Sequence, residues 1–267
     1  MYIQLKKIVI ELSLFILKQA RSCIFAGSFF LLLFLSHHIH IPGLPRYDLL
    51  FLGAVLIQGM LLLTRLETKD EAKVIFLFHI IGLALEIFKT HPAIGSWSYP
   101  EQGYLKIFGV PLYSGFMYAA VGSYISQAWR IFHLRLEHYP PYRSSITICI
   151  LIYLNFFTHH YIPDIRYLLT AVVLVIFWKT RVFFTVWNTE RMMPLWLSFI
   201  LIAFFIWIAE NISTYLGAWK YPDQLVTWSI VSLHKISSWS LLVIISVIIV
   251  GDLKVFKQQK QNKKITL

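Results

Sequence analysis

Long apolar runs, separated by short polar segments, make up most of the sequence. A helix that crosses a membrane needs roughly 20 mostly apolar residues, with a range of about 17–25. Eight runs come close to this length. We predict an all-α, polytopic membrane helix bundle with spans at residues 22–39, 47–64, 73–90, 108–128, 144–160, 164–180, 194–213 and 227–250. Because the fifth and sixth runs are the shortest, seven spans is the alternative.

The N-terminal segment 1–21 mixes charged and apolar residues. It starts with basic residues and continues into an apolar stretch, as a signal peptide does, but it contains Glu11 and has no small-residue cleavage site. We predict an uncleaved amphipathic helix that lies at the membrane interface.

Lysine and arginine are divided unevenly between the loops on the two sides of this bundle. With the N-terminus in the cytoplasm, 18 of the 24 basic residues fall on the cytoplasmic side and 6 on the outer side. Basic residues collect in cytoplasmic loops. The pattern predicts a multi-pass protein of the plasma membrane with both termini cytoplasmic, and it makes residues 251–267 a basic cytoplasmic tail.

Composition agrees with a membrane protein. Hydrophobic residues are 58% of the chain, charged residues are 14%, and the mean hydropathy is +0.66, whereas soluble domains are about 45–50% apolar and about 25% charged. The net charge of +11 comes from residues between apolar runs and not from a basic patch, which argues against nucleic acid as a partner. We expect no cofactor, since neither a nucleotide-binding loop nor a paired-cysteine metal motif occurs.

Two motifs occur twice in the same order. GSWSYPEQ at 95–102 matches GAWKYPDQ at 217–224, and SHHIHIPGLPRYDLL at 36–50 matches THHYIPDIRYLL at 158–169. The offset is 122 residues both at the turns (217 − 95) and at the histidines (159 − 37). We predict a duplication into two parallel four-span halves, which a pseudo-twofold axis brings face to face. The segments are 1–21, a first repeat at 22–128, a cytoplasmic linker at 129–143, a second repeat at 144–250 and the tail at 251–267.

Each aromatic turn follows an acid at the end of an apolar run, Glu86 in the first half and Glu210 in the second. A charged residue at mid-depth in a membrane costs at least about 2.5–3.5 kcal/mol, so such a residue normally faces the bundle interior. We predict Glu86 and Glu210 as catalytic acids that hold a proton at neutral pH. The alternative is a structural hydrogen bond to the following Trp or to the backbone.

Other side chains near these acids form the predicted substrate-binding site. The turns contribute aromatic walls, although an interfacial belt or a purely structural turn would use the same residue types. His79 lies seven residues before Glu86 on the same helix face. Lys235 is in position to pair with Glu210. The predicted substrate-binding residues are Trp97, Tyr99, Trp219, Tyr221, His79, His234 and Lys235.

Paired histidines in the duplicated loops are weak metal candidates: His37, His38, His159 and His160. Histidine is a common metal ligand, but adjacent histidines in a turn point apart. Hydrogen bonding at helix ends is the competing interpretation and the one we favour.

The motifs resemble known families. LNFFTHHYIPD, GSWSYPEQ with GVPLYSGFMYAAVGSY, and WIAENISTYLGAWKYPDQ resemble an uncharacterised family of bacterial integral membrane proteins, domain of unknown function 817. A stretch of about 30 residues also resembles membrane carotenoid hydratases, through Glu86, Gly95, Tyr99 and the following GVPL. Those enzymes often have Tyr at the position of Trp97. The second resemblance implies an acid that acts on an isoprenoid.

Three functions remain open. The first is a membrane enzyme that carries out acid-catalysed hydration or cyclisation of an isoprenoid or other lipid between the two halves. The second is a proton-coupled transporter of a small molecule, because intramembrane acids often carry protons. The third is a receptor or scaffold, which predicts a stable protein partner.

Overall fold

The computed structural model describes the backbone of residues 2–265 and the side chains of residues 4–254. Over this range the chain is mostly helical. The α-helices are α1 (Tyr2–Ser22), α2 (Ile24–Leu35), α3 (Arg46–Leu63), α4 (Lys69–Thr90), α5 (Ser114–Ile131), α6 (Tyr142–Thr158), α7 (Arg166–Phe177), α8 (Leu195–Tyr215) and α9 (Lys235–Ile265). Most of the predicted tail 251–267 therefore lies outside the described side chains, which end at residue 254.

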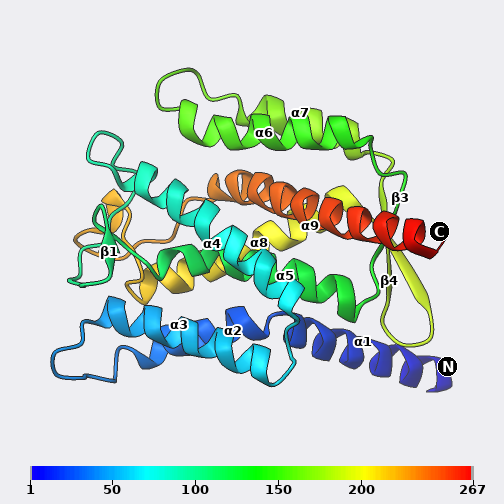
Figure 1. Cartoon of the computed structure of the whole chain (residues 1–267), viewed down its shortest axis with the longest axis horizontal. Coiled ribbons are helices and arrows are strands. Elements are labelled where there is room, and N and C mark those ends of the chain that lie inside the picture. The colour runs from blue at the N-terminus through cyan, green and yellow to red at the C-terminus, as the bar shows by residue number, and fades with distance from the viewer. Residues whose placement is uncertain (1, 266–267) are drawn as a thin grey trace.

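The long helices run side by side along the length of the molecule (Figure 1). Helices α6 and α7 lie together on one side and α2 with α3 on the other, while α4, α5, α8 and α9 occupy the middle. Both termini lie at one end of the bundle, and the turn that contains β1 (Lys106–Ile107) and β2 (Val110–Pro111) lies at the other. The loops that carry the duplicated motifs share this second end, which we call the turn end.

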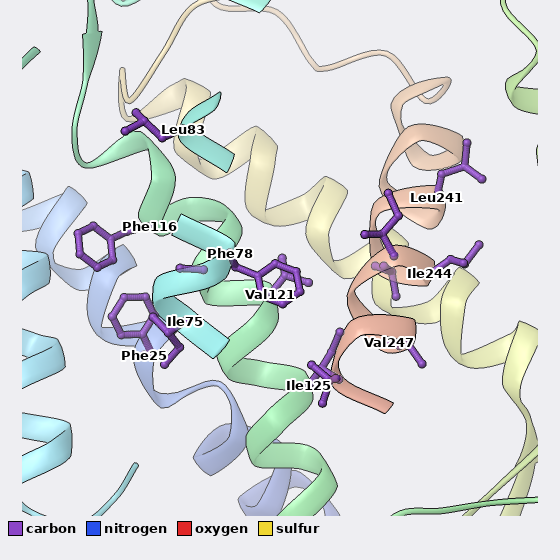
Figure 2. Packing of buried hydrophobic residues seen from close by; sticks show 14 of the residues in the cluster. Phe25, Ile75, Phe78, Leu83, Phe116, Val121, Ile125, Leu241, Ile244 and Val247 are labelled. Carbon is purple, nitrogen blue, oxygen red and sulfur yellow. The ribbon is translucent and has the colours of Figure 1, made fainter. Parts of the chain in front are cut away.

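The core is built where α4, α5 and α9 meet. Figure 2 shows Phe78 of α4, Val121 of α5 and Ile244 of α9 in one apolar cluster. Helices α4 and α5 approach closely because a glycine lies at the contact: a Cβ added at Gly82 would come within 2.5 Å of the Tyr118 ring. Small residues allow this kind of helix contact in membrane proteins.

Three helices of the described chain are long and apolar enough to cross a membrane: α3, α8 and the Lys235–Lys254 part of α9. This indicates a membrane protein. Helices α2 and α7 have only 12 residues each where the spans 22–39 and 164–180 were predicted, because the chain turns at Ser36 and starts α7 only at Arg166.

A small sheet, which the sequence did not predict, lies at the end of the bundle that holds both termini (Figure 1). Strands β3 (Arg135–Glu137), β4 (Arg181–Thr185) and β5 (Glu190–Pro194) pair antiparallel in the order β3-β4-β5. Strand β3 lies within the predicted linker 129–143. Helix α1 is tied to this sheet region, because Lys18 Nζ donates to the Thr185 carbonyl at 2.9 Å and Arg191 pairs with Glu11 at 2.5 Å. An amphipathic pattern reveals an apolar face but not the partner that covers the polar one.

Candidate functional site

The two aromatic turns, 95–102 and 217–224, follow α4 and α8 at the turn end of the bundle. Each begins with a glycine in the left-handed region, with φ of 58° at Gly95 and 63° at Gly217. Side chains other than glycine rarely adopt this conformation, so the glycines let the chain reverse directly after each helix.

The turns pair with each other through their backbones. Ser98 N donates to the Lys220 carbonyl at 2.9 Å, and Lys220 N donates to the Ser98 carbonyl at 3.0 Å, as in an antiparallel bridge. Beside this bridge the rings of Trp97 and Tyr221 meet edge to face with centroids 6.1 Å apart. The two copies of the motif are therefore in direct contact.

Glu86 lies at the centre of a set of aromatic hydrogen-bond donors. Its carboxyl group is buried, and the residue is only 2% exposed. Oε2 accepts from Trp97 Nε1 and from Tyr99 OH, both at 2.7 Å, and Oε1 accepts from Tyr118 OH at 2.7 Å. The bond from Trp97 is the structural role that the sequence offered as the alternative for this acid.

Glu210 has a similar environment. The residue is 3% exposed, Oε1 accepts from Tyr221 OH at 2.5 Å, and Oε2 accepts from Trp239 Nε1 at 2.7 Å. The indole donor comes from α9 and not from the turn, and Trp219 is buried in the same core cluster as Tyr221. Sequence reasoning missed Trp239 and its counterpart Tyr118, whose rings lie 6.5 Å apart between the two acids.

The five donors match carboxylates. An ionised carboxylate only accepts hydrogen bonds, and an indole N–H only donates. Burial and the neighbouring carboxylates raise the pKa of Tyr99 and of Tyr221 well above the usual tyrosine range, so both phenols remain donors. A proton on Glu86 Oε1 requires the Tyr118 hydroxyl to turn and accept, which a phenol is able to do.

Lys235, the first residue of α9, carries a positive charge to the same place. Its Nζ lies 4.4 Å from the ring centroid of Tyr221 and 5.6 Å from that of Trp97. The site thus holds one cation over two aromatic faces that belong to the two acid sites.

The duplicated loops fasten the turn end, each in its own way. Arg46 donates to the Leu216 carbonyl at 2.5 Å and to the Gly217 carbonyl at 3.3 Å, and it also pairs with Glu101. His37 Nε2 lies 2.7 Å from the same Leu216 carbonyl. The first loop therefore caps the end of α8.

The second loop meets α4 in a different way. Lys89 Nζ lies 2.8 Å from His160 Nε2 and 3.3 Å from His159 Nε2. His159 Nδ1 lies 2.8 Å from the Asn155 carbonyl. These are contacts at helix ends, and the His38 ring lies against the Phe34 ring at a tilt of 59°. Within the described residues, no group of three or more His, Cys, Asp or Glu side chains is placed to hold a metal ion.

The remaining predicted residues lie farther from the acids' hydrogen bonds. His79 contacts Phe116 with ring centroids 4.5 Å apart and the rings tilted by 50°, and its Nδ1 is buried without a hydrogen-bond partner among the described residues. His234 is exposed and lies 3.5 Å from the Tyr167 hydroxyl.

A second group of buried acids, which sequence reasoning missed, lies near the start of α4. Glu67 accepts from Ser123 Oγ at 2.5 Å and from Gln127 Nε2 at 2.9 Å, while Glu71 pairs with Arg130 at 2.8 Å. The sequence around these two acids is rich in charged residues and is typical of a solvated loop. Their burial follows from the packing of α5 against α4.

Comparison with known proteins places the chain in a family. It is 55% identical over 246 residues to the uncharacterized protein YoaT of Bacillus subtilis (strain 168), and the match covers 92% of each chain. A solved structure, described as a cross-linked MvINS trimer, is similar over 71% of this chain and 95% of that chain, at 15% identity and a TM-score of 0.46. The family model described as "Protein of unknown function (DUF817)" matches residues 11–247, and the chain belongs to this family.

Proposed function

We propose that this protein is a membrane enzyme that carries out acid-catalysed chemistry, of the hydration or cyclisation type, on an isoprenoid or other lipid. The observation that carries the proposal is the position of the Lys235 ammonium over the faces of Trp97 and Tyr221, beside two buried glutamates. A place that holds an ammonium ion by aromatic faces is suited to a carbocation, because both are stabilised by the ring quadrupole.

In the hydration reaction, a carboxylic acid gives its proton to one carbon of the alkene, and the other carbon becomes the cation. Water adds to that carbon, and a carboxylate takes the extra proton, so that alkene and water become an alcohol. We assign the acid role to Glu86 and the base role to Glu210. The Tyr118 hydroxyl then accepts a hydrogen bond from Glu86 Oε1 when the acid is protonated and donates one to it when the acid is ionised.

We also propose how the chain is arranged in the membrane. The chain forms eight membrane spans as two parallel four-helix halves, with both termini in the cytoplasm and the turn end outside. Support comes from the reciprocal pairing of Ser98 and Lys220, which stand 122 residues apart, the offset of the sequence motifs. Figure 1 also has both termini at one end. In this architecture the site lies between the two halves, so a lipid substrate would enter from the side of the bundle.

The alternative is a proton-coupled small-molecule transporter. His79, two turns from Glu86 on α4, favours it, because its buried Nδ1 has no fixed hydrogen-bond partner within the described chain and an imidazole is able to carry a proton.

Mass spectrometry of lipids bound to the protein in mild detergent tests the proposal, with the native protein compared with Glu86→Gln and Glu210→Gln. We expect a bound isoprenoid or other lipid whose mass changes with the native protein and with the control below, but not with Glu86→Gln or Glu210→Gln. Glu67→Gln is a matched control, since it alters a buried acid at the other end of α4. Identical lipids in all four proteins would refute the enzyme, and proton-dependent uptake in vesicles would then support the transporter.

A further inference from the structure

Lys235 stands where a helix disfavours a cation. It is the first residue of α9, and the first turn of that helix contains no acidic residue. The N-terminus of a helix carries a partial positive charge, which repels a lysine ammonium. The position of Lys235 is therefore explained by its surroundings and not by its own helix.

Those surroundings are aromatic faces. Trp97 and Tyr221 meet at an interplanar angle of 79°, so their rings form a corner, and Lys235 Nζ lies over both rings. We call this corner, together with the flanking carboxyl groups of Glu86 and Glu210, the cation cradle. Its two rings come from the two different turns, and the backbone bridge between Ser98 and Lys220 holds them together.

The cradle attracts positive charge without accepting hydrogen bonds from it. A lysine ammonium has three N–H donors, yet in the described part of the chain Lys235 Nζ makes no hydrogen bond and no salt bridge within 4.0 Å. The nearby carboxyl oxygens accept hydrogen bonds from Tyr99, Tyr118, Trp97, Tyr221 and Trp239 and none from Lys235. The cradle therefore holds its cation by charge and by aromatic faces, which is how a cation without a hydrogen to donate is held.

We propose that the cation cradle is a binding site for a quaternary ammonium group, and that Lys235 occupies it when no such ligand is bound. Quaternary ammonium ions are held by aromatic faces and have no N–H donors to satisfy. Removal of Lys235 leaves the two buried acids without the ammonium that lies over the two rings, which strengthens the attraction for a positive ligand. The inference rests on the proposed function, because a carbocation is also a donor-free cation and uses the same corner.

The ligand has two sources with the same chemistry. One is the choline headgroup of a lipid, and the other is a small free ion. Both present a trimethylated nitrogen, so the free ion butyltrimethylammonium serves as the probe for the cradle, and vesicles of phosphatidylcholine test the lipid source.

The test compares butyltrimethylammonium with butylammonium, which has the same chain but keeps three N–H donors. Binding is followed by tryptophan fluorescence and by the unfolding temperature of the purified protein. We expect the trimethylated ion to bind more tightly, and we expect Lys235→Met to raise its affinity about tenfold by emptying the cradle. Lys220→Met is the matched control, since it removes a lysine from the adjoining turn and should leave the affinity unchanged.

Two variants of Tyr221 separate the ring from its hydroxyl. Tyr221→Phe keeps the aromatic face and should keep the affinity for butyltrimethylammonium, whereas Tyr221→Leu should lose it. If Tyr221→Leu fails to fold, Trp97→Phe, which presents a weaker cation-binding face, should show a smaller but clear loss. Equal affinity for the two probes, or no change in Lys235→Met, would overturn the proposal.

The lipid arm distinguishes the two sources. A rise in unfolding temperature of Lys235→Met in phosphatidylcholine vesicles, relative to phosphatidylglycerol vesicles, assigns the headgroup. Binding of the free probe without that rise assigns a small ion, and the absence of both refutes the cradle. A protein that binds the probe but leaves all membrane lipids unchanged would refute the enzyme and not the cradle. A Glu86-dependent change in lipid without preference between the probes would refute only the cradle.

Discussion

Ser98 and Lys220 exchange both of their backbone hydrogen bonds, at 2.9 and 3.0 Å, although 122 residues separate them along the chain. A reciprocal bridge of this kind is an antiparallel pair, and its local symmetry is twofold. It places Trp97 of one turn against Tyr221 of the other. The site that holds Lys235 thus depends on contact between two distant segments.

Breaking this bridge should open the site. Lys220→Pro removes the N–H that donates to the Ser98 carbonyl, and a hydrogen bond of this kind contributes about 0.5–1.5 kcal/mol. We expect a clear fall in the unfolding temperature in detergent, together with a loss of quenching between the two turns in tryptophan fluorescence. Lys220→Ala keeps the N–H and should unfold like the native protein. Equal stability of the two variants would show that the bridge contributes little.

Part of the site was predictable because it is local. An acid followed within 13 residues by Trp and Tyr in a glycine-led turn suggested that Glu86, Trp97 and Tyr99 meet, and the structure brings them together. Membership of the family was likewise predicted from short motifs and is confirmed. The local pattern does not say which indole bonds to Glu210: Trp239 of α9 donates to it, while Trp219 is buried in the same core cluster as Tyr221.

The rest depends on packing between helices, which no local pattern encodes. Tyr118 reaches Glu86 only because Gly82 lets α5 approach α4. Trp239 reaches Glu210 across the contact between α8 and α9. Glu67 reads as part of a charged loop, yet it is 2% exposed because Ser123 and Gln127 of α5 cover it. A hydropathy pattern finds helices but not the neighbours of each face.

The two oxygens of Glu86 should respond differently to loss of a donor. Tyr118→Phe removes the donor to Oε1, whereas Tyr99→Phe leaves Trp97 on Oε2. A hydrogen bond contributes about 1.5–3 kcal/mol when Glu86 is ionised and about 0.5–1.5 kcal/mol when it is protonated, so in either state Tyr118→Phe should lower the free energy of unfolding more than Tyr99→Phe. In the Glu86→Gln background the effect of Tyr118→Phe should shrink, because contacting residues are coupled. Additive effects in the double variant would contradict the contact.

The close approach of α4 and α5 predicts that Gly82→Ala destabilises the protein. A Cβ at Gly82 would lie 2.5 Å from the Tyr118 ring and 2.7 Å from its Cβ, which leaves the ring nowhere to move within the helix contact. Overpacking of this kind costs about 1–3 kcal/mol, and it should also weaken the bond from Tyr118 to Glu86. Gly59→Ala in α3 is the control: its Cβ meets nothing within 4 Å, so it should be neutral or stabilising by up to about 1 kcal/mol. Thermal unfolding of both variants decides the matter.

The loop after α6 should make the turn end sensitive to acid. Burial and the nearby Lys89 ammonium lower the pKa of His160 from 6.5 to about 4, and burial also lowers the pKa of His159. Between about pH 4 and pH 6.5, the unfolded chain binds more protons at His160 than the folded chain does, so stability rises with pH. The contribution of His160 is complete above about pH 6.5 and is lost as the pH falls toward 4. Unfolding measured across this range should show that slope in the native protein, and His160→Gln, which cannot take up a proton, should flatten it; an unchanged slope in the variant would assign the acid sensitivity to other groups.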